Sequence, residues 1–113
     1  MLKIYHNPRC GKSREGLEIL EASGRDFEVV RYLEQPPSEG ELRDIIEKLG
    51  IAPMDLVRKN EEIWKQRYKG KQLSGTEVIT ALVENPKLME RPIVIKGKKA
   101  VIGRPPILIK TLL

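Results

Sequence analysis

The chain has 113 residues, about one domain, and is long enough to bury a hydrophobic core without disulfides or structural metals. Its net charge of +5 suits small anions as readily as nucleic acid. Only 4% of its residues are aromatic, so no stacking surface for bases is evident, and we expect no nucleic-acid partner. The single cysteine excludes an internal disulfide, no apolar run approaches the roughly 20 residues of a membrane span, and the first residues show no secretion signal, so we expect a cytoplasmic protein without membrane contact.

The first third of the chain predicts a strand, a helix and a second strand. Residues 2–5 and 27–32 are rich in β-formers, and a helix is expected between them from about Gly11 to Ser23, with Gly24 ending it. This order implies a parallel pair of strands that is joined by a right-handed crossover.

The middle of the chain predicts a helical insertion at about residues 38–85. Ser38 and Ser74 are each followed three residues later by a glutamate, the pattern of a capping box. Apolar residues at helical spacing follow both serines, and a less regular helical stretch is expected between them from Ala52 to about Lys69.

The last third predicts a β-hairpin and a final helix. Residues 93–95 and 100–102 flank a turn that contains Gly97, and the last helix is expected to begin near Pro105 and Pro106. The whole order is βαβ, a helical insertion, then ββα. We therefore expect one α/β domain over residues 1–113, with a mixed four-stranded sheet that resembles the thioredoxin-like arrangement.

The segment Tyr5–Arg14 contains the only cysteine and the only histidine of the chain. It joins the first strand to the first helix, so Cys10 stands where unpaired N–H groups and the helix dipole favour an anion such as a thiolate. A lone cysteine is often a small buried hydrophobe, but the proline, glycine and basic neighbours make this a poor setting for core packing. We interpret Cys10 as a nucleophile. Its pKa would be lowered further by nearby cations, for which the loop offers His6, Arg9, Lys12 and Arg14.

The Tyr5–Arg14 segment closely resembles the active-site loop of the glutaredoxin-coupled arsenate reductases. Further blocks are similar to that family in the same order, namely Leu33–Pro37, Leu56–Asn60, Asn85–Val94 and Gly103–Pro106. The resemblance covers nearly the whole chain and implies a thioredoxin-like fold with an inserted helical part. The chain stops soon after Leu112, as in a compact subgroup of the family.

The resemblance also implies a mechanism. Cys10 would be the catalytic nucleophile, Arg58, Arg91 and Arg104 would bind the oxyanion substrate, and His6 would favour the thiolate. The implied substrate is arsenate or a similar oxyanion, with glutathione as co-substrate and glutaredoxin as the protein that regenerates Cys10. No bound cofactor and no metal are expected.

Two of these arginines are also supported by their place in the sheet. Arg91 precedes Pro92 at the start of one strand and Arg104 follows the end of another, and these strand ends would face the cysteine loop. We also expect the Arg91–Pro92 bond to be cis, as before the corresponding strand of thioredoxin-like proteins. On composition alone Arg58 would be a solvated surface charge, so its role depends mainly on the resemblance.

The sequence allows two interpretations for each of two polar residues in the cysteine loop. Ser13 would either hydrogen-bond the Cys10 thiolate or cap the helix. His6 would either tune the thiolate or be a structural histidine whose hydrogen bonds are satisfied.

A regulatory function, a different reductase activity and simple anion binding compete with arsenate reduction. A related branch of the family consists of redox-sensing transcription regulators that bind RNA polymerase and carry Cys-x-x-Cys in this loop. Here the second position is Ser13, so that disulfide switch is lacking. The different reductase would be a glutathione-linked thiol reductase with another substrate, and simple anion binding would make the chain a plain oxyanion-binding module.

Overall fold

The computed structural model describes residues 2–113, which cluster into two compact units. The sheet unit consists of the two ends of the chain, up to Gln35 and from Arg91 onward, and the helical unit is Pro36–Glu90. The insertion expected at about residues 38–85 falls within the helical unit.

The sheet unit contains a mixed sheet of four strands within residues 2–113, in the order β2-β1-β3-β4. These strands are β1 (Leu2–Tyr5), β2 (Phe27–Val30), β3 (Ile93–Lys96) and β4 (Lys99–Ile102). β1 runs parallel to β2 and antiparallel to β3, and β3 runs antiparallel to β4. The predicted mixed, thioredoxin-like sheet is therefore confirmed.

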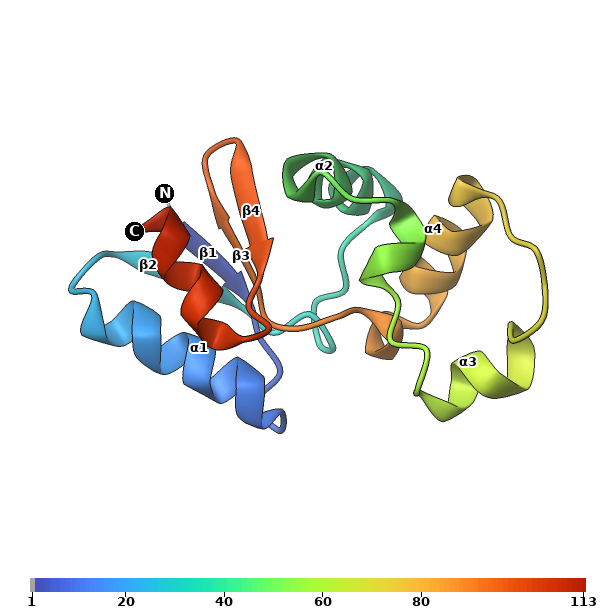
Figure 1. Cartoon of the computed structure of the whole chain (residues 1–113), viewed down its shortest axis with the longest axis horizontal. Helices are drawn as coiled ribbons and strands as arrows, with labels where there is room; N and C mark the ends of the chain where they lie inside the picture. The colour runs from blue at the N-terminus through green and yellow to red at the C-terminus, as the bar shows by residue number, and fades with distance from the viewer. Residues whose placement is uncertain (1) are drawn as a thin grey trace. The chain divides into compact units, whose positions relative to one another are not determined.

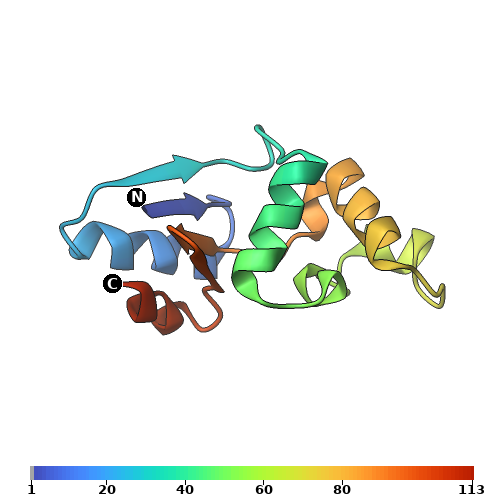
Figure 2. The same cartoon turned by 90° about the horizontal axis from the view of Figure 1, so that it is seen from above.

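Two helices pack side by side against this sheet. They are α1 (Gly11–Ala22) and the 3-10 helix η3 (Pro106–Leu112), and η3 lies alongside α1 in both views (Figures 1 and 2). The sequence predicts a final helix there, and the structure gives it the tighter 3-10 winding, entered through two prolines. Strands and helices share one buried core of Leu2, Ile4, Leu20, Val94, Ile109 and Leu112.

The helical unit is built from α2, α3 and α4 with two short 3-10 turns. Its elements are α2 (Glu39–Leu49), η1 (Pro53–Leu56), α3 (Glu62–Arg67), α4 (Gly75–Glu84) and η2 (Pro86–Leu88). Both predicted capping boxes are confirmed, because Ser38 and Ser74 accept from Glu41 and Glu77 while each glutamate accepts from the serine N–H. α2 and α4 pack together through their apolar faces.

No helix among the described residues is long and apolar enough to cross a membrane.

Candidate active site

Cys10 is the N-cap residue of α1 in the sheet unit. Its backbone is extended, with φ −95° and ψ 123°, and its N–H donates to the carbonyl of Asn7 at 3.0 Å. The thiol is half-buried. The backbone N–H groups of Lys12 and Ser13, in the first turn of α1, lower the pKa of the thiol by favouring its charged form. The helix N-terminus therefore presents its unpaired donors to Cys10, as the strand-loop-helix order predicts.

Two arginines that lie far along the chain from Cys10 complete the surroundings of its sulfur. Nη2 of Arg104 donates to Cys10 Sγ at 3.4 Å, and Nε of the same side chain donates to the carbonyl of Arg91 at 2.8 Å. The Arg91 side chain also hydrogen-bonds Cys10. Arg91 precedes β3 and Arg104 follows β4, so the antiparallel pairing of these strands brings both arginines to the same edge of the sheet.

These contacts change the acidity of the thiol. Burial would by itself raise the pKa of Cys10, because it disfavours the charged form. The N–H of Ser13, the hydrogen bond from Arg91, the N–H of Lys12 and the charge of Arg91 together outweigh burial, and the net effect lowers the pKa. The site therefore favours a thiolate, the reactive form of cysteine.

The cations beside the thiol are not those that the loop sequence predicts. Arg14 donates from Nη1 to the carbonyl of Pro8 at 3.0 Å, and Lys12 pairs with Glu15 at 3.7 Å. Arg9 is exposed. The sequence predicts that His6, Arg9, Lys12 and Arg14 supply the cations that lower the pKa of Cys10, whereas the charge that lowers it in the structure is that of Arg91, which precedes β3.

Under the loop lies a buried polar network of His6, Asn7 and Ser13, whose exposed fractions are 4%, 7% and 0%. The Ser13 hydroxyl lies 2.6 Å from His6 Nδ1 and accepts from the Asn7 N–H at 3.0 Å. Asn7 Oδ1 in turn accepts from the Arg9 N–H at 3.0 Å. Since unpaired buried polar groups are costly, this network fixes the path of the loop and with it the direction of the Ser13 N–H.

The network revises what was expected of Ser13 and His6. The Ser13 hydroxyl points to His6 and Asn7, so it is the backbone N–H of Ser13 that reaches the thiol, and the N-cap of α1 is Cys10. Burial and the charge of Arg31 lower the pKa of His6, so at neutral pH it is not a cation beside the thiolate. The hydrogen bonds favour the structural role of His6.

Asn7 and Arg31 contribute to the site although their sequence context did not predict it. In a sequence, an Asn-Pro pair is typical of a turn and indicates nothing more, but here the asparagine ties both ends of the loop. Arg31 follows β2, and no local sequence pattern marks it as part of the site. Its charge lowers the pKa of His6 only because β2 pairs with β1. The expected cis bond between Arg91 and Pro92 is confirmed, and the Arg104–Pro105 bond, for which no prediction was made, is cis as well.

Arg58 belongs to the helical unit, where it follows η1. Its N–H donates to the carbonyl of Leu88 at 2.7 Å, and its Nε lies 3.6 Å from Glu61 Oε1, an ion pair longer than a hydrogen bond. Its side chain is 23% exposed, less than a solvated surface charge would be. Its assignment as the third oxyanion-binding arginine stays a prediction.

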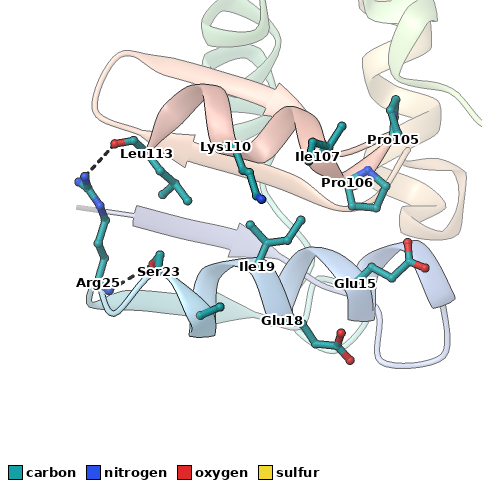
Figure 3. Close-up of a pocket in the computed structure, with 11 residues that line it drawn as sticks. Glu15, Glu18, Ile19, Ser23, Arg25, Pro105, Pro106, Ile107, Lys110 and Leu113 are labelled. Atoms are coloured by element: carbon teal, nitrogen blue, oxygen red, sulfur yellow. Dashed lines mark hydrogen bonds between the residues drawn. The ribbon is translucent and has the colours of Figure 1, made fainter.

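The sheet unit also has a groove of about 880 Å³ between α1 and η3, shown in Figure 3. Apolar side chains such as Ile19 and Ile107 line it together with charged Glu18 and Lys110. Cys10, Arg91 and Arg104 are not among its lining residues, so the groove is separate from the thiol site. Within residues 2–113 no three His, Cys, Asp or Glu side chains gather to hold a metal ion.

Comparisons with known proteins agree over nearly the whole chain. The model of the ArsC family matches residues 5–112. Arsenate reductase of Haemophilus influenzae is 45% identical over 105 residues, 91% of this chain and 90% of that protein, and the uncharacterised protein YfgD of Escherichia coli K12 is 50% identical over 107 residues, 93% and 90%. The solved structure of arsenate reductase from Vibrio cholerae superposes with a TM-score of 0.95 at 42% identity, covering 99% of this chain and 97% of that one.

Proposed function

The chain belongs to the ArsC family, and we propose that it is an arsenate reductase with Cys10 as its nucleophile and glutathione and glutaredoxin as its electron donors. Relatives that are named arsenate reductases support the reaction. The observation that carries the proposal for this chain is that Arg104 and Arg91 both donate hydrogen bonds to the Cys10 sulfur. An anion that approached this sulfur would meet two guanidinium groups.

In the first step that we propose, the Cys10 thiolate attacks arsenic. A sulfur–arsenic bond forms, and one arsenate oxygen leaves with protons as water. Arg91 and Arg104 hold the remaining oxygens, because a guanidinium group pairs two oxygens at once and stays charged throughout the reaction. Donors that are already in place where negative charge develops lower the barrier without reorganisation.

In the second step a glutathione thiolate attacks the Cys10 sulfur. The sulfur–sulfur bond forms as the sulfur–arsenic bond breaks, and the electron pair stays on arsenic, which changes from As(V) to As(III). Two thiols have then supplied two electrons, and Cys10 is left in a mixed disulfide. A glutaredoxin thiol attacks the glutathione sulfur and releases Cys10, by the ordinary route of thiol–disulfide exchange.

Arg58 would supply a third guanidinium group for the oxyanion, and His6 and Ser13 would support the thiolate through the loop. The chemistry needs no bound cofactor or metal, since sulfur provides the electrons. A cytoplasmic location fits, because glutathione is kept reduced there.

The test is coupled turnover with arsenate, glutathione, glutaredoxin, glutathione reductase and NADPH. We expect NADPH oxidation that depends on arsenate and is lost in Cys10→Ser. Turnover that is unaffected in Cys10→Ser would contradict the proposal. Arsenate-independent reduction of glutathione mixed disulfides through Cys10 would instead favour a glutathione-linked thiol reductase with another substrate.

A further inference from the structure

Gly103 follows β4 and directly precedes Arg104, and it is buried. Its φ is not in the left-handed region, so its backbone does not require glycine. The lack of room for a side chain does require glycine. A Cβ at this position would lie 2.9 Å from Pro92 Cγ and 3.0 and 3.2 Å from Ile109 Cδ1 and Cγ1. Carbon atoms pack best at about 3.5–4.0 Å, so a methyl group here forces a neighbour to move by roughly half an ångström or more.

The residues that would move are tied to the thiol site. The Gly103 N–H donates to the carbonyl of Pro92 at 2.8 Å, and one residue further Arg104 donates to the carbonyl of Arg91 at 2.8 Å. These two hydrogen bonds hold Arg91 and Pro92 against Gly103 and Arg104. From this arrangement the same Arg104 side chain donates through Nη2 to Cys10 Sγ at 3.4 Å.

The helix that carries Cys10 is packed against the same two side chains. A Cβ on Gly16 of α1 would lie 2.9 Å from both Pro92 Cγ and Ile109 Cδ1. Pro92 and Ile109 are therefore enclosed by a glycine of α1 and a glycine that follows β4. Displacing them from the Gly103 side also changes the support on which α1 lies.

We propose that Gly103 is a positioning residue for the Cys10 site: its missing side chain lets Pro92 and Ile109 pack closely enough for Arg104 to reach both Arg91 and the Cys10 sulfur. This inference deepens the proposed arsenate reduction, and its expected effect on kcat/KM rests on that proposed function. The positioning of Arg91 and Arg104 at the thiol does not depend on which substrate the protein reduces.

The test compares Gly103→Ala with a matched control, Gly75→Ala. A Cβ on Gly75 would also face a proline, Pro53, but at an ordinary 3.5 Å from its Cγ. For Gly103→Ala we expect kcat/KM for arsenate to fall by about tenfold or more, since misplacement by an ångström can cost about 10²-fold. We also expect the pH midpoint of Cys10 alkylation by iodoacetamide to rise. Gly75→Ala should keep the wild-type values of both.

A second substitution tests whether the clash with Ile109 contributes to the raised alkylation midpoint of Gly103→Ala. Ile109→Val removes Cδ1, which is one of the atoms that the new methyl group meets. Gly103→Ala/Ile109→Val should therefore have an alkylation midpoint between those of wild type and Gly103→Ala, because the clash with Pro92 remains.

A folded Gly103→Ala protein with the wild-type alkylation midpoint would overturn the proposal. If Gly103→Ala does not fold, the double variant is compared with Ile109→Val alone, and equal midpoints in these two would overturn it. Alkylation needs no arsenate. A raised midpoint in a chain whose wild type reduces no arsenate would therefore leave the positioning role standing and reject the proposed function.

Discussion

Arg104 donates a hydrogen bond to the Cys10 sulfur at 3.4 Å across 94 residues of sequence. The same guanidinium group donates from Nε to the carbonyl of Arg91, whose own side chain hydrogen-bonds Cys10. Both arginines stand at strand ends and the cysteine stands at a helix end, so three regular elements meet at one sulfur.

The Cys10 thiol should titrate below its ordinary pKa. The N–H groups of the first helical turn and the Arg91 guanidinium outweigh burial and favour the thiolate. Rates of iodoacetamide alkylation measured against pH should show a midpoint below about 8.5, the ordinary thiol value. Because Cys10 is the only cysteine of the chain, the label reports on one site.

His6→Ala should raise that midpoint, since it removes the ring beside the Ser13 hydroxyl and loosens the N–H that faces the thiol. An exposed substitution in the helical unit, Lys59→Ala, should leave it unchanged. A wild-type midpoint at the ordinary thiol value would remove the activated thiolate from the mechanism.

Stability should fall as the pH drops below about 6.5, the unfolded pKa of histidine. Burial and Arg31 lower the folded pKa of His6, so the unfolded state binds a proton that the folded state does not, and stability rises with pH until both forms are neutral. Denaturant unfolding measures this slope at several pH values between roughly 5.5 and 7.5, the range in which histidine titrates.

His6→Asn should reduce the slope, because His6 is the only histidine of the chain. The measurement belongs in a Cys10→Ser background, since a thiol with a lowered pKa adds its own pH dependence in the same direction. Equal slopes with and without His6 would show that its folded pKa is not lowered.

Arg104→Lys should lose most of the activity although it keeps the charge. Arg104 makes two contacts through different nitrogens, and a lysine ammonium is a single compact group that cannot span both. We expect kcat/KM for arsenate to fall roughly 10²-fold, as for the loss of one preorganised donor in other enzymes. Steady-state kinetics with unchanged thermal unfolding would assign the loss to the site, whereas wild-type kinetics would exclude a bidentate role.

The parts of the structure that could be predicted are those that local signals determine. The capping boxes at Ser38 and Ser74 depend on residues three positions apart, and both formed as expected. Arg91 and Arg104 could be placed near Cys10 because strand order alone decides which ends of a sheet meet.

What could not be predicted depends on contacts between distant segments. The burial of His6, its pairing with the Ser13 hydroxyl and the charge of Arg31 beside it arise only when β1, β2 and α1 pack together. The same holds for the space around Gly103, since Pro92 and Ile109 come from distant parts of the sequence. A glycine near a strand end has the same sequence signal whether it serves a turn or a close approach.

Arg58→Ala should weaken arsenate binding while its neighbour Lys59→Ala should not. Both positions carry one positive charge on the same short segment, but Lys59 is exposed and Arg58 is half-buried. If Arg58 holds an arsenate oxygen, its loss should raise the KM for arsenate, and the matched loss of the Lys59 charge should have little effect at physiological salt. Equal kinetics in the two variants would remove Arg58 from the oxyanion-binding residues.

The path of the electrons can be followed by measuring the intact mass of the protein, which reports what is attached to Cys10. After sulfur has attacked arsenic, another thiol must regenerate it, and the chain has no second cysteine. Incubation with arsenate and glutathione should therefore give a protein that is one glutathione heavier by intact-mass spectrometry, and glutaredoxin should remove the addition. Neither the adduct nor turnover should appear with Cys10→Ser. Arg104→Lys should form the adduct more slowly, because Arg104 acts before glutathione arrives. Turnover that is sustained by thioredoxin alone would keep Cys10 as the nucleophile and reject the glutathione step.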